Sequence, residues 1–371
     1  MLDVVERGLA ADWSVEEISK DKSWIFPLTP SEALALIEGV RQGRVEGRDL
    51  LEYSPEDFDL GPGLKLISRA FLEAQNGRGI ALVRGLPRDG VSEEEFALMT
   101  WAIGLAIGVA RPQGRASQYL SEVRNAGGVY RSPTGRGYSS NAELDFHVDG
   151  GDLVALTCYN VARAGGASRV ASSVRAYEVM RAERPDLLEA LFEPFVFNLQ
   201  GEEQEGEAPT MSRPIYAVKD GKPFCNWNRN RIEAAQTRED VPRLTSRQIE
   251  AVDLLDDVIR RPDVMFEMKL EPGDMQILNN HTALHSRTLF EDYDEPERKR
   301  LLYRLWLNPR DNEALPESLL SFFPSAEGNI VRGGTNGHHY DALRQSFEAR
   351  LAKYHGLRPP LDPADRLNGR V

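Results

Sequence analysis

Cysteine and histidine are both scarce in this chain of 371 residues, and each shortage narrows the sites that it can hold. The two cysteines, Cys158 and Cys225, are too few for a disulfide framework. Neither stands beside a companion base in the sequence, so neither is proposed as a nucleophile. The chain has only six histidines, and a site built on imidazole must draw on this set: His147, His281, His285, His338, His339 and His355.

The chain also lacks an excess of positive charge and long apolar runs. The net charge is −13, which argues against binding to a nucleic-acid duplex or to an anionic membrane surface. The first residues, MLDVVERGLA, have no signal-peptide core. The longest weakly polar run, residues 101–110, is interrupted by glycines and is too short to span a bilayer. We therefore expect a soluble, cytoplasmic protein whose partner is a small molecule.

Helix signals are spread along the chain. Thr29 and Ser92 each begin a capping box, and Thr245 is followed by Gln248 at the same spacing. A further helix is expected over residues 173–192. In the helix after Thr245, the predicted buried stripe is Ile249, Val252, Leu255 and Ile259.

Strand signals concentrate in the middle and late parts of the chain. They fall at residues 79–84, 152–161, 265–270, 275–278 and 300–307, while residues 111–145 and 201–213 are expected to be loops. This order lacks the regular strand–helix alternation of a doubly wound sheet. It favours a β-barrel or jelly roll with flanking helices, that is, a mainly β fold of the α+β class.

One short motif carries metal-binding potential. In Phe146-His147-Val148-Asp149, the histidine and the aspartate are two residues apart. Residues at this spacing point to the same side of an extended chain, so both side chains can reach one ion. A second histidine pair, His281 and His285, directly follows a predicted strand. Two histidines and one carboxylate leave open positions on a metal, as in non-haem Fe(II) oxygenases.

The strand at residues 300–307 adds an anion-binding element. Alternation places Arg300, Leu302, Arg304 and Trp306 on one face and apolar residues on the other. The apolar face should be buried in the core, and the tryptophan favours a barrel lumen for the arginine face. An arginine in a lumen can hold a carboxylate through two parallel hydrogen bonds.

Together these segments resemble the taurine dioxygenase (TauD/TfdA) family of Fe(II)- and 2-oxoglutarate-dependent oxygenases. The resemblance runs from about Gly79 to Pro309 and rests on four segments in the family's order: FHVDGGD, AGGAS, LNNHTALHSR and RKRLLYR. It implies a double-stranded β-helix, the jelly roll of clavaminate synthase-like enzymes. We expect this domain over residues 61–355, after a helical extension at 1–60 and before a tail at 356–371.

The resemblance also implies roles for individual residues. His147, Asp149 and His285 would bind Fe(II), with His281 packing or hydrogen-bonding beside them. Ser168 and Arg300 would hold the tail of 2-oxoglutarate, and Arg304 would lie near its metal-side carboxylate or the substrate's anion. Because fifteen positions separate His285 from Arg300, Arg298 and Lys299 are the alternative anchors. The cosubstrates implied are 2-oxoglutarate and O2.

The implied reaction is hydroxylation of an unactivated C–H bond, with release of succinate and CO2. The expected substrate is small and polar, an amino acid or another carboxylate-bearing compound. Family members that bind taurine use a histidine on the N-terminal side of the His-x-Asp motif. This chain has no histidine before His147, so taurine is disfavoured. Halogenating relatives replace the carboxylate by a small residue, so the presence of Asp149 favours hydroxylation. Candidate substrate contacts are Gln118, Tyr119, Asn141 and Gly150, and carboxylates that can hold an amine are Glu143, Asp145 and Asp152.

Two other functions compete with this interpretation. A non-catalytic jelly-roll binding or scaffold protein would keep the fold without turnover. A zinc hydrolase would use the same three metal ligands, but it would need a base near the metal and would leave the two arginines unexplained. The resemblance further suggests a homodimer or homotetramer, and no nucleic-acid or membrane partner is expected.

Overall fold

A mixed seven-stranded sheet forms the centre of the computed structural model, which describes residues 8–132, 137–321, 323 and 325–360. Strand β2 lies between β1 and β13, and the order continues through β5 and β16 to β3, with β4 also pairing with β16. The strands are β1 (Ile25–Pro27), β2 (Ile80–Arg84), β3 (Gly108–Arg111), β4 (Leu120–Val123), β5 (Leu153–Asn160), β13 (Met275–Asn279) and β16 (Leu301–Pro309).

A three-stranded sheet packs against this central sheet. It contains β7 (Ser168–Ser172) between β12 (Met265–Met268) and β14 (Ala283–Arg287). Buried residues of both sheets, including Val154, Leu278 and Val170, form one apolar cluster. Two sheets with their inner faces in contact make the predicted jelly roll.

Three two-stranded sheets complete the strands that the described residues form. These are β6 (Ala164–Gly165) with β15 (Phe290–Glu291), β8 (Phe195–Asn198) with β9 (Thr210–Arg213), and β10 (Tyr216–Lys219) with β11 (Lys222–Cys225).

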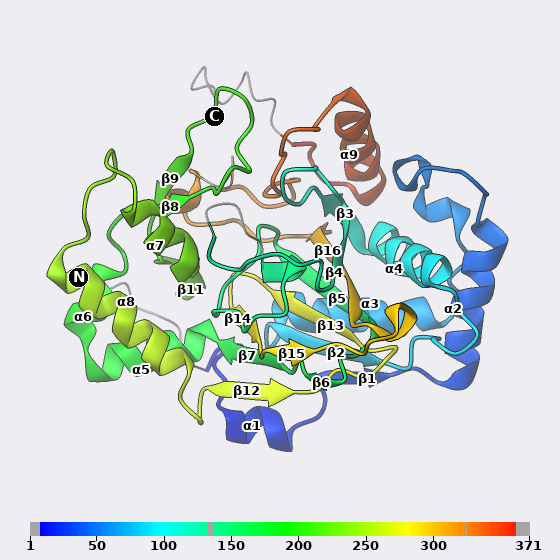
Figure 1. Ribbon diagram of the computed structural model, residues 1–371, viewed down its shortest axis with the longest axis horizontal. Coiled ribbons are helices and arrows are strands. Elements are labelled where there is room, and N and C mark those ends of the chain that lie inside the picture. The colour runs from blue at the N-terminus through cyan, green and yellow to red at the C-terminus, as the bar shows by residue number, and fades with distance from the viewer. Residues whose placement is uncertain (1–7, 133–136, 322, 324, 361–371) are drawn as a thin grey trace.

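Helices flank the sheets on both sides, so the fold is mainly β with helical layers, as the sequence predicts (Figure 1). The α-helices are α1 (Val15–Lys20), α2 (Pro30–Gly43), α3 (Gly63–Asn76), α4 (Glu93–Ile107), α5 (Ser173–Glu183), α6 (Pro185–Ala190), α7 (Arg229–Gln236), α8 (Ser246–Ile259) and α9 (Ala342–His355). Short 3-10 helices lie at Leu50–Glu52, Pro55–Asp57, Gly137–Ser139, Pro296–Arg298 and Glu317–Leu319. Within the described ranges, no helix has the length and apolarity needed to cross a bilayer.

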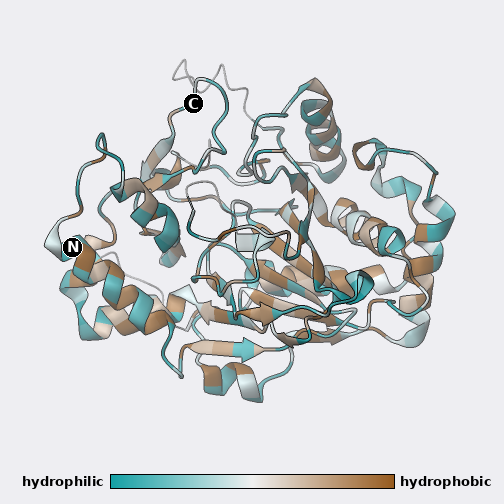
Figure 2. Ribbon diagram, in the orientation of Figure 1, coloured by the Kyte–Doolittle hydropathy of each residue, from teal (hydrophilic) through white to brown (hydrophobic). Residues whose placement is uncertain are grey.

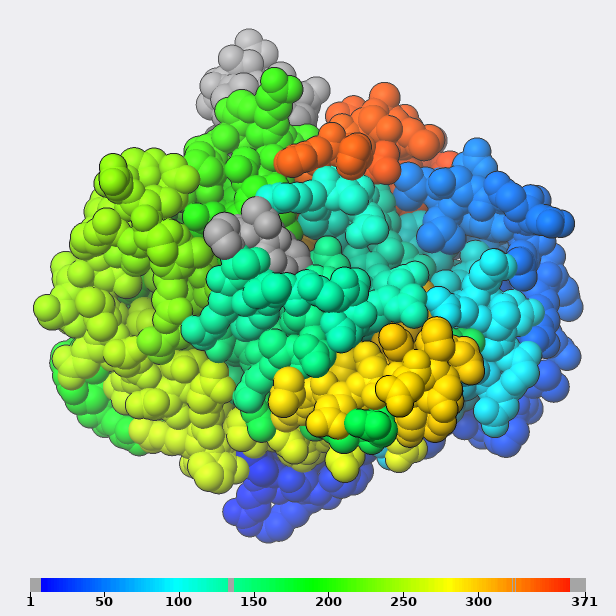
Figure 3. Space-filling model, viewed as in Figure 1, coloured from blue at the N-terminus to red at the C-terminus, as the bar shows by residue number. Residues whose placement is uncertain are grey.

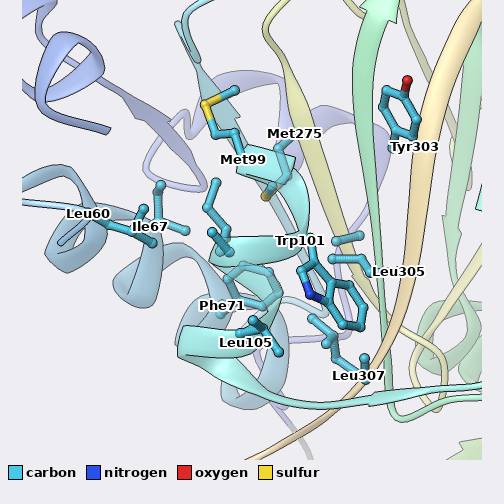
Figure 4. Close-up of a cluster of buried hydrophobic side chains, with 14 of the residues drawn as sticks. Leu60, Ile67, Phe71, Met99, Trp101, Leu105, Met275, Tyr303, Leu305 and Leu307 are labelled. Carbon is cyan, nitrogen blue, oxygen red and sulfur yellow. The ribbon is translucent and has the colours of Figure 1, made fainter. Parts of the chain in front are cut away.

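The largest core lies between the central sheet and helices α3 and α4. Leu305 and Leu307 of β16 point into it beside Trp101 of α4 (Figure 4). The opposite face of the same strand carries Arg304 and Trp306 toward an internal cavity. The prediction that this strand has one apolar face and one face with arginine is therefore confirmed. Figure 2 shows the apolar residues concentrated on the strands and on one side of the flanking helices.

The three predicted helix starts are confirmed. Thr29, Ser92 and Thr245 cap α2, α4 and α8, each with a complete capping box. The single helix expected over 173–192 is wrong, because the chain forms α5 and α6 with a break at Arg184. Pro185 has no N–H to donate and disfavours a helical conformation at the residue before it, so a new helix begins there.

Ile249 was wrongly placed in the buried stripe of α8, because it is exposed on the outer side.

Two segments expected to be loops contain strands. Residues 120–123 form β4, and residues 210–213 form β9. Each is only four residues long and carries a weak strand signal, so its strand character comes from pairing with β16 or β8 rather than from local preference.

The first 60 residues contribute more than helices. Strand β1 pairs in parallel with β2 and extends the central sheet. The predicted division at residues 60 and 355 stays a prediction, and residues 361–371 of the expected tail lie outside the described part of the chain.

A buried carboxylate ties the start of β5 to three other segments. Asp152 accepts hydrogen bonds from Arg332 Nε, Asn308 Nδ2 and Asn312 Nδ2, each at 2.9 Å. Its Oδ1 also lies 2.9 Å from Nε2 of His281. Burial would raise the pKa of Asp152, but the neighbouring Arg332 and His281 hold it well below its usual range.

We predict that Asp152→Asn lowers the free energy of unfolding by about 3–5 kcal/mol, because Arg332 would lose its buried counter-charge. Urea unfolding near pH 7 measures this loss, and the exposed Asp89→Asn is the matched control. Since the folded-state pKa is depressed, the difference from wild type should be complete above about pH 5 and shrink as the pH falls below that. A loss no larger than that of Asp89→Asn would contradict the assignment.

Candidate functional site

Three predicted residues from distant parts of the sequence converge at the floor of the cavity. His147, Asp149 and His285 each place one potential ligand atom within 4.8 Å of the others. The imidazole rings of the two histidines are 4.4 Å apart between centroids. Nε2 of His285 lies 3.6 Å from Oδ2 of Asp149.

Backbone pairing explains how these residues meet. The segment around His147 runs antiparallel to β14, and His147 and His285 exchange two N–H···O hydrogen bonds of 3.0 Å each. Leu144 N also donates to the carbonyl oxygen of Arg287 at the far end of the same strand. The motif of residues 146–149 is thereby held as an added edge of the three-stranded sheet.

Hydrogen bonds around the cluster orient its side chains. Nδ1 of His147 lies 2.8 Å from the carbonyl oxygen of Asp145, which leaves Nε2 for a ligand. The backbone N–H of Asp149 donates to Oδ1 of Asn280 at 3.0 Å, and Nδ2 of Asn280 donates to the carbonyl oxygen of Gly151 at 2.9 Å. Asn280 thus fixes the short loop that carries the carboxylate.

The charge states of the cluster suit a divalent cation. Burial lowers the pKa of His285 to about 3, with a further contribution from His147, so its imidazole is neutral. Burial would raise the pKa of Asp149, but Arg304, His285 and His147 hold it below its usual range. Two imidazoles and one carboxylate are the donor set of facial-triad Fe(II) sites.

The cluster lies on a cavity of about 400 Å³. The described lining residues include five arginines and four carboxylates: Arg213, Arg231, Arg287, Arg300, Arg304, Asp149, Glu202, Glu203 and Glu207. Their segments come from the middle and the end of the chain.

In Figure 3, the gold segment near residues 290–300 lies beside the teal segment near residues 137–145 on the face shown, consistent with the hydrogen bond from Phe290 N to Asn141 O.

Arg304 lies directly beside the clustered carboxylate. Its Nη1 donates to Oδ1 of Asp149 at 3.1 Å, and its Nε donates to Oε1 of Gln113 at 2.7 Å. The guanidinium also stacks over Trp306, with its carbon 5.0 Å from the ring centroid. Arg304 therefore occupies a fixed position next to the possible metal.

Ser168 and Arg300 lie together at one end of the cavity. Ser168 donates from Oγ to Oε1 of Gln276 at 2.9 Å, and both residues line the cavity with Arg300. Gly166 is required here, because a Cβ at this position would be 3.3 Å from Nε of Arg300, at a φ of +73°. Arg298, one alternative anchor, is instead exposed and stacks over Tyr293.

The four predicted substrate contacts are placed differently. Gly150 lines the cavity. Tyr119 is buried in the core and donates to Oε1 of Glu348 at 2.7 Å. Gln118 and Asn141 are exposed. Only Gly150 of this group therefore belongs to the cavity lining that the structure describes.

The suggested carboxylates for a substrate amine are also placed elsewhere. Asp152 is bound by Arg332 and its other partners, while Glu143 and Asp145 pair with Arg169 and Arg131. The acidic side chains on the cavity are instead those of residues 202, 203 and 207.

Sequence reasoning missed several cavity residues, above all Arg213 and Arg287. Arg213 lies in the segment interpreted as a solvated loop, so no strand pattern marked it. Arg287 lies two residues after His285, and strand alternation alone would have placed both side chains on one face.

Comparison with known proteins agrees with this geometry. The family model described as "Taurine catabolism dioxygenase TauD, TfdA family" matches residues 46–306. The chain belongs to this family. As the sequence predicts, it is a non-haem iron dioxygenase of the class that uses Fe(II), 2-oxoglutarate and O2.

Two relatives match most of the chain. "FR-33289 synthase" of Streptomyces rubellomurinus (strain ATCC 31215) is 27% identical over 311 residues, covering 83% of this chain and 91% of the relative. "Taurine hydroxylase-like protein SAT17" of Stachybotrys chartarum (strain CBS 109288 / IBT 7711) is 30% identical over 314 residues, covering 79% and 77%.

Solved structures share the fold of this TauD/TfdA-family chain. Asparagine oxygenase (AsnO) has a TM-score of 0.57 at 17% identity, covering 80% of this chain and 97% of that one. The non-haem iron oxygenase OrfP in complex with Fe and alpha-ketoglutaric acid has a TM-score of 0.59 at 16% identity, covering 76% and 93%. Both likenesses confirm the double-stranded β-helix.

We predict that Asn280→Ala lowers the free energy of unfolding of the metal-free protein by about 1–3 kcal/mol. The change leaves the N–H of Asp149 and the carbonyl of Gly151 without their shared partner. Denaturant unfolding measures the loss. Unchanged stability would show that Asn280 does not fix the loop.

Proposed function

We propose that His147, Asp149 and His285 bind one Fe(II) ion through two imidazole nitrogens and one carboxylate oxygen. The observation that carries this proposal is their clustering on a cavity that also contains Ser168 and Arg300. The residues fit the ion, because two imidazoles and one carboxylate are donors that Fe(II) accepts and backbone pairing fixes the two histidines.

The same cavity offers places for both ends of 2-oxoglutarate. Arg304, beside Asp149, would face the metal-side carboxylate, while Ser168 and Arg300 would hold the tail. Arginine suits these roles because its planar guanidinium donates two parallel hydrogen bonds to a carboxylate. Leu156, Leu302 and Trp306 line the space between and limit the access of water.

The proposed reaction is hydroxylation of a C–H bond. When bound, iron with 2-oxoglutarate and O2 supplies the oxidising chemistry that converts R–H to R–OH, with succinate and CO2 as the other products. One oxygen atom of O2 enters the alcohol and the other enters succinate. The chain's own contribution is to hold both reactants in fixed positions and to keep water out.

The substrate we propose is a small polar molecule with an anionic group, such as an amino acid. The lining carries more arginine than the paired carboxylates Asp149 and Glu202 can neutralise. Glu203 and Glu207 at the other side can meet an amine. Structures of the same fold contain 3-hydroxyasparagine in asparagine oxygenase and (3S)-hydroxy-L-Arg in OrfP. Cytoplasmic location and a homo-oligomeric state stay predictions from the sequence.

We predict that anaerobic apoprotein titrated with Fe(II) and then 2-oxoglutarate develops the weak visible charge-transfer band of the metal chelate. His285→Ala should abolish the band, because it removes one of three ligands. Arg300→Ala should keep the band but require roughly 10- to 100-fold more 2-oxoglutarate, as expected for a lost charge-assisted pair. His339→Ala, which changes an exposed histidine that does not line the cavity, is the matched control.

The competing functions give other outcomes. A zinc hydrolase would bind Zn(II) tightly and show no band with 2-oxoglutarate. A scaffold protein would show neither, and it would release no succinate with any compound of a library. Either result in the wild-type protein would overturn the proposal.

A further inference from the structure

Arg287 is a buried arginine on the cavity whose hydrogen bonds are incomplete. It is 5% exposed. Its Nη2 donates to the carbonyl oxygens of Ser140 and Ala142, at 2.9 and 2.6 Å. Within the described part of the chain, Nε and Nη1 are buried without a hydrogen-bond partner. Two N–H groups of a cationic side chain are therefore left for a ligand, since such groups are costly to bury unpaired.

The strand register places this arginine at the level of the predicted cosubstrate tail. Arg287 lies two residues after His285 in β14, about 7 Å along the strand and on the same face. In the neighbouring strand β7, its direct partner is Ser168. Paired residues of adjacent strands point to the same side of a sheet. Arg287 and Ser168 therefore face the same end of the cavity.

Arg300 directly precedes β16 of the central sheet and lies beside Arg287. The guanidinium carbons of Arg287 and Arg300 lie 4.6 and 5.0 Å from the ring centroid of Phe290. The Nη1 of Arg300 donates one long hydrogen bond of 3.4 Å to the carbonyl oxygen of Val123. Among the described residues, no carboxylate lies within 4.0 Å of the cationic nitrogens of either arginine. Two guanidiniums thus share one buried, apolar-walled end of the cavity.

The two charges are costly where they lie. Arg287 and Arg300 are only 5% and 6% exposed, so both guanidiniums are largely removed from water. Burial also lowers the pKa of Arg300 to about 10. By contrast, Arg304 and Arg231 on the same cavity have carboxylate partners at 3.1 and 2.6 Å. The charge of Asp292 offsets part of the penalty at Arg300. Among the described residues, however, the guanidiniums of Arg287 and Arg300 have no such direct carboxylate partner, so an anion beside Ser168 would lower the remaining penalty.

We propose that Arg287, in β14, and Arg300, directly before β16, together bind the tail carboxylate of 2-oxoglutarate. This inference rests on the proposed function and adds a binding residue to it. Arg287 would give the carboxylate the donors of Nε and Nη1, and its Nη2 would keep the residue fixed on the backbone of residues 140 and 142.

The consequence is selectivity for a 2-oxo acid with a charged tail. A ligand with a neutral tail would leave the buried guanidiniums of both Arg287 and Arg300 without an anionic partner. The protein should therefore bind it much more weakly than 2-oxoglutarate. The matched ligand that tests this is 2-oxopentanoate, which has the same chain length as 2-oxoglutarate and the same metal-chelating end but no tail carboxylate.

The experiment compares the two ligands on Arg287→Gln. The Fe(II)-loaded, oxygen-free protein is titrated with each 2-oxo acid, and binding is followed by the charge-transfer band and by calorimetry. We expect Arg287→Gln to weaken 2-oxoglutarate binding about 10- to 100-fold, as for the loss of charge-assisted hydrogen bonds. Binding of 2-oxopentanoate should change by less than about twofold, because the deleted contacts face a group that this ligand lacks.

Two further variants keep the test decisive. Arg163→Gln is the matched control. Arg163 directly precedes β6, is exposed and forms an ion pair with Glu291 of β15. This variant should bind both ligands as wild type does. If Arg287→Gln fails to fold, Arg287→Lys retains the charge with a single point donor. It should lose an intermediate amount of 2-oxoglutarate affinity and none for 2-oxopentanoate.

The outcomes separate the inference from the function on which it rests. The inference is overturned if both Arg287 variants bind 2-oxoglutarate as tightly as wild type does, or if they lose equal affinity for the two ligands. In either case, a charge-transfer band in the wild-type protein still upholds the proposed function. A wild-type protein that gives no band with either ligand overturns both.

Discussion

Two backbone hydrogen bonds between His147 and His285 are the constraint on which the site depends. They join a motif in the middle of the chain to the edge strand of the smaller sheet, and they place two imidazoles and Asp149 around one point. Because backbone pairing sets the positions of the two histidines, their side chains need only local hydrogen bonds for orientation. An example is the contact between Nδ1 of His147 and the carbonyl oxygen of Asp145. The three side chains that we propose as iron ligands are thereby held close together in the protein without metal.

The jelly roll supplies the other half of the site through the two faces of one strand. Leu305 and Leu307 anchor β16 in the core against α4, and this packing fixes Arg304 and Trp306 on the cavity face. The smaller sheet carries His285, Ser168 and Arg287 toward the same space. An anion held between the sheets would therefore meet arginines from both.

Much of this could be predicted from the sequence, and the reasons differ from element to element. The alternation in residues 300–307 was strong enough to assign both faces of β16, and the capping boxes located α2, α4 and α8, because these signals are local. Strands β4 and β9 were missed because each is only four residues long and becomes a strand by pairing, β4 with the distant β16 and β9 with β8. Tyr119 was taken for a substrate contact because no local pattern shows that its hydroxyl reaches Glu348, more than 200 residues away. Arg287 was overlooked although its spacing from His285 was readable.

The most direct test of the central claim is a crystal structure of the protein grown without oxygen in the presence of Fe(II) and 2-oxoglutarate, with anomalous diffraction at the iron edge. The account predicts one iron peak bonded to His147, Asp149 and His285, with the tail carboxylate of 2-oxoglutarate beside Arg300. An iron peak at any other set of residues, or a 2-oxoglutarate bound away from this cavity, would contradict it.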